Sequence, residues 1–460
     1  MLDNHSQTDR QSQIAQSYDA HFNHLREVYD RALDNHRFES LIVYSGAIKK
    51  QFQDDIQYPF FVNLQFKAIV PLCDAPESWV IWKPSEKPLL LLFQPDDFWH
   101  ETPELPSTFW SSYFKIIPLR EKEDAQKYFG NTKHCAFLGE SNESINSWDL
   151  GQHNHEAFIA ELNWYRSYKT QYEKCCVAEA NHITVQGHAA AREAFYSGAS
   201  ELEIALAFQQ ACQQPEEQLA FASIIGINEH AGILHYSGRD INRIAGDKRR
   251  SFLIDAGATY NGYAADTCRT YAYRDDGLFA EMISALDAAQ QAIIKGLKAG
   301  TQYIDNHALA MRQLATLLKD FGIVNLEPDS VVELDIIKYF MPHNVSHFLG
   351  LQVHDVGGNQ ADICGTLIDS NEPKHKMRRA IEANHILTVE PGIYFIDTLL
   401  KSLAQSEHRN VIGWDRIEQL KPYGGMRIED NILITKDGPV NVTRYAFNEL
   451  SAKSNTRKIV

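Results

Sequence analysis

The chain has 460 residues, enough for two or three domains, and its apolar and charged fractions of 44% and 23% are ordinary for a globular protein. A net charge of −16 argues against a nucleic acid or an anionic membrane surface as a partner. Seven irregularly spaced cysteines predict reduced thiols and a cytoplasmic protein, and the polar N-terminus lacks the apolar core of a signal peptide.

The first part of the chain predicts an α/β domain with a mixed sheet. Helical periodicity runs from Ile14 to Asn35. Short apolar runs then predict strands over 40–44, 68–72, 79–82 and 89–93. Because the pattern becomes helical near residue 160, we expect an N-terminal domain over 1–160 and a second domain over 161–460.

The second domain is predicted to mix helices with short strands. Helical patterns cover 172–196, 279–298 and 303–321. A further helix opens at Ser200, where Ser200 and Glu203 have the spacing of a capping box. Strands are expected over 220–228 and 232–236.

The segment 253–271 predicts a β-hairpin. Asn261-Gly262 is the strongest short-range hairpin signal in the chain, because both central positions of a type I′ turn need positive φ. A two-residue turn at this place puts Tyr260 opposite Tyr263. Counting outward along the two strands, Asp255 is expected opposite Cys268.

This register puts two carboxylates together. Asp255 and Asp266 share one face with Cys268, since side chains alternate faces along a strand. Two carboxylates in apolar surroundings repel each other and lose hydration, so they need cations or a shared proton. The alternative for the hairpin taken alone is a solvated hairpin with surface acids.

Three histidines follow in the stretch MPHNVSHFLGLQVHDVGG. His343 and His347 share a face on either a helix or a strand, and their surroundings favour a strand. His354 has the wrong parity for that face, so a bend at Gly350 has to redirect it. Neutral imidazole is a common metal ligand. His235, in the expected strand 232–236, is by itself more typical of a core residue.

Two glutamates lie in apolar strand patterns, where an unpaired carboxylate is costly to bury. They are Glu390 in HILTVEPGIYFI and Glu429 in GGMRIEDNILIT. Arg427 is two residues before Glu429, so an Arg–Glu pair is the alternative there. It leaves Glu390, Asp255 and Asp266 without a cation on the same face.

Four carboxylates and one histidine can balance two divalent ions and one hydroxide. Such an oxygen-rich donor set favours Mn²⁺ or Co²⁺ over a structural zinc site. Two metals about 3.5–4 Å apart can share a water, lower its pKa and polarise a carbonyl group.

These residues, with the stretches ILHY, MPHNVSHFLGLQVHDVGG, TVEPGIYF and GGMRIEDN, resemble the dimetal pita-bread peptidases, which include prolidase, aminopeptidase P and methionine aminopeptidase. The N-terminal part, including YPFFVNLQFKAIVP, resembles the bacterial Xaa-Pro dipeptidases, whose relatives include the organophosphorus acid anhydrolases. The resemblance implies an α/β N-terminal domain, a C-terminal pita-bread domain and a homodimer.

The resemblance also implies residue roles. Asp255 would bind one metal, Asp266 and Glu429 would bridge both, and His347 and Glu390 would bind the second. Two Mn²⁺ ions are expected, with Co²⁺ as the alternative, and a hydroxide between them would attack the carbonyl of an Xaa-Pro dipeptide. Glu390 would pass a proton to the prolyl nitrogen. The implied substrate pocket, whose histidines also serve catalysis, comprises His235, His343, His354 and Arg427.

Other functions remain open. Aminopeptidase P would remove Xaa from longer Xaa-Pro peptides, and a phosphotriesterase side activity is compatible with the same site. A metal-free pita-bread binding module is disfavoured because all five ligand positions are filled. Two departures from many relatives are Phe221 in place of a tyrosine and Cys268 in place of a threonine, whose hydroxyls would support the metal cluster.

Overall fold

The computed structural model of the chain describes residues 7–99, 104–369 and 376–457. It divides into two units. The first unit contains the described residues from Gln7 to Cys176 together with Gln360–Leu367. The second unit contains Val177–Asn359 and the chain from Ile368 onward.

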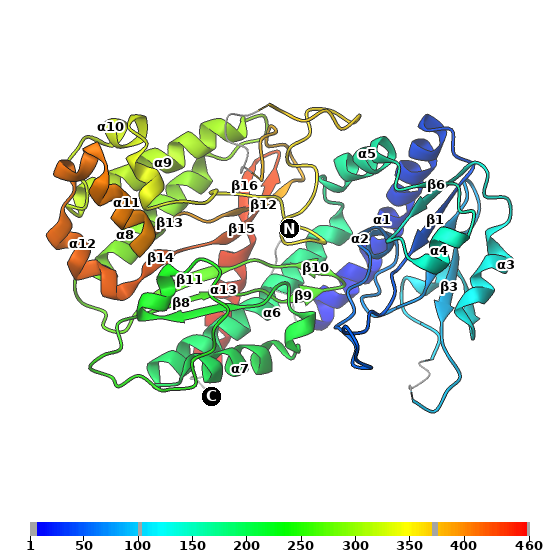
Figure 1. Cartoon of the computed structure of the whole chain (residues 1–460), viewed down its shortest axis with the longest axis horizontal. Helices are drawn as coiled ribbons and strands as arrows, with labels where there is room; N and C mark the ends of the chain where they lie inside the picture. The colour runs from blue at the N-terminus through cyan, green and yellow to red at the C-terminus, as the bar shows by residue number, and fades with distance from the viewer. Residues whose placement is uncertain (1–6, 100–103, 370–375, 458–460) are drawn as a thin grey trace. The chain divides into compact units, whose positions relative to one another are not determined.

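The first unit is built on a six-stranded mixed sheet with the order β4-β3-β2-β1-β5-β6 (Figure 1). Strand β1 is antiparallel to β2 and parallel to β5, as a mixed sheet requires. The strands are β1 (Ser40–Tyr44), β2 (Trp79–Trp82), β3 (Leu89–Phe93), β4 (Lys115–Leu119), β5 (Cys135–Leu138) and β6 (Gln152–His153). Three of the four predicted strands, those at 40–44, 79–82 and 89–93, are therefore confirmed.

The strand expected over 68–72 is wrong, because most of that stretch belongs to a helix or to the turn after it. The Asn63 side chain accepts a hydrogen bond from the backbone N–H of Gln65, which starts the helix. Phe66 and Ile69 are buried three residues apart, as on one helical face. The helices of this unit are α1 (Gln7–Asn35), α2 (Leu64–Ile69), α3 (Gln126–Phe129), α4 (Glu143–Ser147) and α5 (Glu156–Arg166).

Residue 160, where the sequence pattern changes, lies inside α5. That helix is tied to α1, because Glu161 accepts hydrogen bonds from Asn35 Nδ2 at 3.0 Å and His36 Nε2 at 3.1 Å. The division between the units lies further on, between Cys176 and Val177, inside α6 (Gln171–Tyr196).

The second unit combines short sheets with long helices. The sheets have the orders β11-β8-β7, β12-β15-β16, β13-β14 and β10-β9. The strands are β7 (Ile224–Ile227), β8 (Ser251–Asp255), β9 (Thr259–Tyr260), β10 (Tyr263–Ala264), β11 (Cys268–Ala272), β12 (Ile386–Val389), β13 (Gly392–Tyr394), β14 (Gly425–Arg427), β15 (Asp430–Thr435) and β16 (Gly438–Asn441). Besides α6 the helices are α7 (Glu201–Cys212), α8 (Leu278–Gly296), α9 (Tyr303–Asp320), α10 (Pro328–Glu333), α11 (Asp397–Gln405), α12 (Trp414–Leu420) and α13 (Val442–Arg457).

The hairpin forms in the predicted register. Tyr263 pairs with Tyr260 across the turn, and Cys268 pairs with Asp255 further out. Asn261 and Gly262 have φ values of 47° and 82°, as the turn requires. The ladder is interrupted between β10 and β11, and Asp266 lies in that interruption. Figure 1 shows β8, β11 and β14 side by side, joined by hydrogen bonds between β11 and β14.

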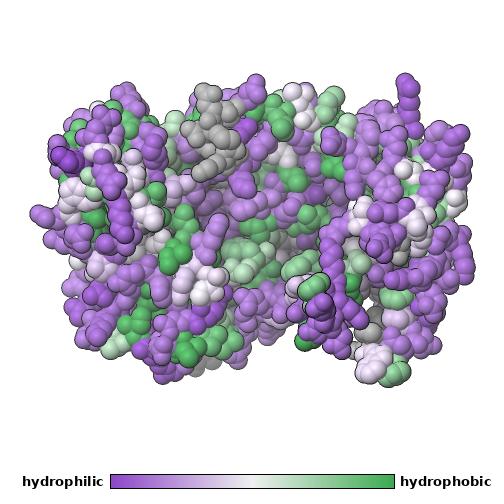
Figure 2. Space-filling view, in the orientation of Figure 1, coloured by the Kyte–Doolittle hydropathy of each residue, from purple (hydrophilic) through white to green (hydrophobic). Residues whose placement is uncertain are grey.

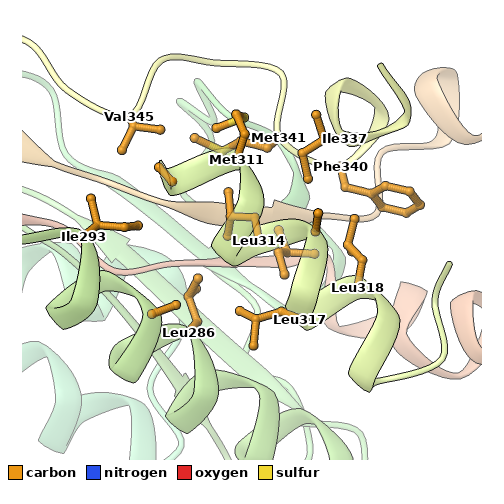
Figure 3. Packing of buried hydrophobic residues seen from close by; sticks show 14 of the residues in the cluster. Leu286, Ile293, Met311, Leu314, Leu317, Leu318, Ile337, Phe340, Met341 and Val345 are labelled. Atoms are coloured by element: carbon orange, nitrogen blue, oxygen red, sulfur yellow. The ribbon is translucent and has the colours of Figure 1, made fainter. Parts of the chain in front are cut away.

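The apolar core of this unit lies around α8 and α9. Leu286 and Ile293 come from one face of α8, and Leu314 and Leu318 come from α9. Figure 3 shows these side chains packed in one cluster with those of the segment 337–345. This cluster supports the strands and loops that carry the polar residues described next.

Two further expectations are wrong. Residues 232–236 are not a strand but the end of a 3-10 helix and a turn, because the Ile233 N–H donates to the His230 carbonyl at 3.0 Å and the Tyr236 N–H donates to the Ile233 carbonyl at 3.1 Å. His343 and His347 do not lie in a regular strand: backbone hydrogen bonds join Val345, His347 and Leu349 to β12 and to Glu390, which follows it, but the only bridge among the described residues of this segment is at Phe348, and the segment around His343 is irregular. In the described part of the chain, no helix combines the length and apolarity that a membrane span needs.

Candidate metal centre

The five predicted ligands come from separate elements that meet in the second unit. Asp255 ends β8, and Asp266 precedes β11. Glu390 follows β12, and Glu429 lies between β14 and β15. His347 is held against β12 because its carbonyl accepts a hydrogen bond from the Thr388 N–H at 3.0 Å. An isolated bridge between Cys268 and Glu429 joins the two halves of the centre.

The side-chain ends converge around the imidazole of His347. One ligand atom from each of Asp266, His347 and Glu429 lies within 4.8 Å of the others. Nε2 of His347 is 3.4 Å from Asp266 Oδ2, 3.5 Å from Glu390 Oε1 and 4.0 Å from Glu429 Oε1. Three carboxylates from distant parts of the sequence therefore face one imidazole nitrogen.

The second nitrogen of His347 fixes the orientation of the ring. Nδ1 lies 3.0 Å from the carbonyl oxygen of Phe348, to which it can donate its proton. That hydrogen bond leaves Nε2 directed at the carboxylates. A hydrogen bond of this kind, made by the ring nitrogen that does not bind the metal, orients a histidine for a metal ion.

Burial makes the charges of this cluster costly. Burial and the neighbouring acid Asp266 raise the pKa of Asp255 to about 7, against the opposing effect of Arg427. Burial also raises the pKa of Glu390 to about 8 and that of Glu429 well above its usual value. Burial by itself would lower the pKa of His347, but its contacts with Asp266 and Glu390 outweigh burial and raise it to about 9. The charge of the His347 imidazole alone therefore does not balance the four carboxylates.

Arg427 supplies one cation, and its position differs from the expected one. Its Nη2 donates to Asp255 Oδ2 at 2.6 Å, whereas its Nε is 4.0 Å from Glu429 Oε2. The expectation that Asp255 has no cation beside it is wrong. The Arg427–Asp255 ion pair joins β14 to β8, which belong to different sheets. It therefore depends on the packing of the two sheets and not on residue spacing along one strand.

Tyr394 connects Arg427 to the first histidine. Its hydroxyl accepts from Arg427 Nη1 at 2.6 Å and lies 2.7 Å from His343 Nε2. His343 Nδ1 lies 2.8 Å from the carbonyl oxygen of Asn344 and 3.3 Å from Glu390 Oε2. Burial and the charge of Arg427 lower the pKa of His343 to about 3, so the imidazole is neutral and accepts the tyrosine proton.

Tyr394 had no role assigned from the sequence. It lies in the stretch TVEPGIYF, which already carried Glu390. The pairing of β13 with β14 sets Gly392 opposite Arg427, so Tyr394 lies two residues along on the same face. Tyr394 could have been identified as a site residue if the pairing of β13 with β14 had been known.

The other two histidines lie beside this group. The rings of His347 and His354 are 4.4 Å apart and perpendicular. The chain turns back between them, because the Asp355 N–H donates to the Phe348 carbonyl at 2.8 Å. His235 is exposed. Burial is the main cause of the lowered pKa values of His343 and His354, and the electrostatic effect of His235 lowers both further. Contacts thus join eight of the nine predicted site residues in one group, and His235 acts on that group through its electrostatic effect.

The backbone of Asp266 is held by a side chain. Asn431 accepts from the Asp266 N–H at 3.0 Å through Oδ1 and donates to the Asp266 carbonyl through Nδ2. The Thr443 hydroxyl accepts from the Asn431 N–H at 2.9 Å and donates to Asn181 Oδ1 at 2.7 Å. All three side chains are fully buried. The interrupted hairpin is therefore fixed by helices α6 and α13.

The centre fits divalent metal ions. Oδ1 of Asp255 is buried without a hydrogen-bond partner in the part of the chain that the structure describes. A buried carboxylate oxygen of this kind needs a donor or a cation. The donors are carboxylates with one imidazole nitrogen, a set that suits Mn²⁺ or Co²⁺. The thiol of Cys268 is buried opposite Asp255, and burial raises its pKa well above the usual value, so it is not a thiolate.

Family models match both parts of the chain. Residues 16–164 match the N-terminal domain of Xaa-Pro dipeptidase, and residues 175–436 match metallopeptidase family M24. The chain is 41% identical over 434 residues to the Xaa-Pro dipeptidase of Pseudoalteromonas translucida, covering 94% of this chain and 98% of that one. It is 40% identical over 438 residues to that of Aeromonas hydrophila, covering 95% and 99%.

Solved structures share the fold. Escherichia coli aminopeptidase P with the inhibitor Pro-Leu has a TM-score of 0.69 at 19% identity, covering 93% of this chain and 99% of that one. The zinc-substituted form of that enzyme with product has a TM-score of 0.68 at 20% identity, covering 93% and 98%. These matches, together with the buried carboxylate–histidine centre, show that the chain belongs to metallopeptidase family M24 and has the N-terminal domain of the Xaa-Pro dipeptidases.

Proposed function

We propose that the chain is an Xaa-Pro dipeptidase that hydrolyses the bond between any residue and a C-terminal proline. The observation that carries this proposal is the meeting of Asp266, His347 and Glu429 in one buried cluster. It occurs in a chain 41% identical to an Xaa-Pro dipeptidase over nearly the whole length of both proteins.

The proposed ligands of two divalent ions are Asp255, Asp266, His347, Glu390 and Glu429. Asp266 and Glu429 are the proposed bridging ligands, and Mn²⁺ is the proposed ion, with Co²⁺ as the alternative. When bound, such a pair of ions lowers the pKa of a shared water and polarises the scissile carbonyl.

Glu390 is the proposed proton carrier to the prolyl nitrogen. Its side chain is 15% exposed, against 11% for Asp255, 6% for Asp266 and 2% for Glu429. It is the most exposed of the four carboxylates, and we propose that the substrate approaches from its side. Its two oxygens lie 3.5 Å from His347 and 3.3 Å from His343, so it can receive and release a proton without leaving its place.

The proposed substrate pocket consists of His235, His343, His354 and Arg427. The hydroxyl of Tyr394 holds Arg427 and His343 in fixed directions, so both can meet a substrate without first reorganising. Two donors of Arg427 are used by Asp255 and Tyr394, and we propose that its remaining donors contact the substrate.

The test is product analysis on matched peptides. Protein reconstituted with Mn²⁺ is incubated with Ala-Pro, Leu-Pro and the tripeptide Ala-Pro-Ala. The proposal predicts release of proline from both dipeptides and little or no cleavage of the tripeptide. Cleavage of the tripeptide without cleavage of the dipeptides would instead identify an aminopeptidase P activity. A phosphotriester substrate in the same assay measures the proposed side activity.

We further propose that the protein is a homodimer in the cytoplasm. No disulfide forms among the described residues, as expected for a protein of a reducing compartment. The dimer is proposed from the resemblance to the family. Light scattering coupled to size exclusion would measure twice the chain mass of 52.4 kDa for a dimer, and a value equal to one chain would contradict it.

A further inference from the structure

The carboxylate of Glu201 stands out among the buried charged groups outside the metal centre. Glu201 is the first residue of α7 and is 2% exposed. A buried carboxylate needs donors for both oxygens. Its donors all belong to strand β7 and to the loop that follows, residues 228–240, which we call the His235 loop.

Each oxygen of Glu201 accepts two hydrogen bonds. Oε1 accepts from the Ile227 N–H at 2.9 Å and from His230 Nδ1 at 2.7 Å. Oε2 accepts from the Tyr236 hydroxyl at 2.7 Å and from the Asp240 N–H at 3.1 Å. One carboxylate thereby joins the beginning, the middle and the end of the His235 loop to a helix.

Further contacts reinforce this arrangement. The rings of His230 and Tyr236 stack at 4.4 Å, and the Leu202 N–H donates to the Asp240 carbonyl at 3.2 Å. The 3-10 helix that begins the loop packs on Gly424 at the other side. His235 directly precedes Tyr236, is exposed, and is one of the groups that lower the pKa values of His343 and His354, after burial as the main cause. The position of His235 therefore follows from the contacts of its neighbours with Glu201.

We propose that Glu201 is a positioning residue for substrate binding, which acts by holding His235 beside the other two pocket histidines. None of its four donors is a proposed metal ligand, so its effect falls on the substrate rather than on the metal. This inference rests on the proposed function, because it requires His235 to contact the dipeptide.

The test compares Glu201→Gln with Glu203→Gln. Glutamine keeps the size of the side chain, but its amide nitrogen faces donors and loses two of the four hydrogen bonds. Glu203 lies in the same helical turn and pairs with the exposed Arg243, so it controls for changes at the helix start. With Mn²⁺ at saturation we expect the KM for Ala-Pro to rise roughly tenfold in Glu201→Gln, kcat to change by less than about threefold, and Mn²⁺ content to stay the same.

Two further measurements separate positioning from general destabilisation. Amide hydrogen exchange of the Ile227 and Asp240 N–H groups is expected to speed up in Glu201→Gln. Adding Glu201→Gln to His235→Ala is expected to raise KM little further, because both changes remove the same contact.

An unchanged KM in Glu201→Gln with active wild-type protein would overturn this inference alone, as would fully additive effects of the two substitutions. No turnover of Ala-Pro by the wild-type protein would overturn the proposed function and the inference with it. Loss of Mn²⁺ from Glu201→Gln would also overturn it, because Glu201 would then act on the metal centre.

Discussion

At the scale of single residues, the hydrogen bonds that each side chain already makes decide which of its atoms are available to a metal ion or a substrate. Nδ1 of His347 is engaged by the Phe348 carbonyl, so Nε2 is left for a metal ion. The hydroxyl of Tyr394 accepts from Arg427 and therefore directs its own proton to His343. Hydrogen bonds thus form a series in which each group donates to the next: Arg427 to Tyr394, Tyr394 to His343, and His343 to the carbonyl of Asn344.

The first prediction concerns Tyr394→Phe. The substitution keeps the ring but leaves both Arg427 and His343 without their shared partner, so kcat/KM for Ala-Pro should fall about 10–100-fold. Mn²⁺ content should not change, because the tyrosine touches no proposed ligand directly through its hydroxyl. The control is Tyr423→Phe, whose ring stacks on Phe279. An unimpaired Tyr394→Phe enzyme would show that the series has no catalytic use.

Sequence reasoning at this scale reached the acids and histidines but missed two contacts. Buried carboxylates are visible in a sequence because apolar neighbours surround them. The Arg427–Asp255 pair spans 172 positions and forms only where β14 crosses to β8. Neither that pair nor the role of Tyr394 follows from periodicity within a single strand.

At the scale of elements, the interrupted hairpin is the part that needs external support. The turn at Asn261-Gly262 and the Asp255–Cys268 pairing were predictable because a two-residue turn fixes the register. Between β10 and β11 backbone hydrogen bonds from the Ala265 and Ala256 N–H groups still cross the hairpin, whereas the Asp266 N–H donates to the side chain of Asn431 on β15. The segment that carries His343 and His347 could not be predicted, since its shape depends on contacts with β12.

The second prediction concerns Asn431→Ala. Loss of both hydrogen bonds to the Asp266 backbone should weaken Mn²⁺ binding about 10–100-fold, measured by calorimetric titration of metal-free protein. Thr443→Val should have a smaller effect in the same direction, because it acts through Asn431. Thr435→Val is the control, since that hydroxyl lies on the same strand and bonds in the turn at Gly438. Equal metal affinity in Asn431→Ala and the control would contradict the role given to Asn431.

At the scale of the whole molecule, the stability of the two units depends on different conditions, because they bury different ionisable side chains. Figure 2 shows hydrophilic residues over most of the visible face, which agrees with a net charge of −16. The second unit buries several carboxylates whose pKa values are raised, so its stability should depend on bound cations. The first unit buries His21, whose Nδ1 lies 2.8 Å from the Thr170 hydroxyl oxygen.

The third prediction is that chelation destabilises the protein. A ligand present at about 100 times its dissociation constant adds about 2.7 kcal/mol to the free energy of unfolding, so adding EDTA to Mn²⁺-loaded protein should lower Tm by about 3 °C for each ion removed. Added Mn²⁺ should restore it. Asp266→Asn should show a much smaller response to either reagent. A wild-type Tm that changes with neither EDTA nor Mn²⁺ would contradict the idea that cations neutralise the buried carboxylates.

The fourth prediction concerns pH. Burial lowers the pKa of His21 to about 4, against 6.5 in the unfolded chain, so the unfolded state binds the extra proton first as pH falls. Stability is therefore lost between pH 6.5 and pH 4, by up to about 3 kcal/mol. His21→Gln keeps a polar partner for Thr170 without titrating, so its urea unfolding should lose less free energy over this range than that of the wild type or of His24→Gln. If the free energy of unfolding fell equally with pH in all three proteins, His21 would not be the source of the acid destabilisation.

The central claim is that side chains from five places in the second unit hold two divalent ions together. Crystals of Mn²⁺-loaded protein measured at the manganese absorption edge test it most directly. The account predicts two anomalous peaks about 3.5–4 Å apart, bounded by Asp255, Asp266, His347, Glu390 and Glu429. A single peak, or peaks away from these residues, would contradict it.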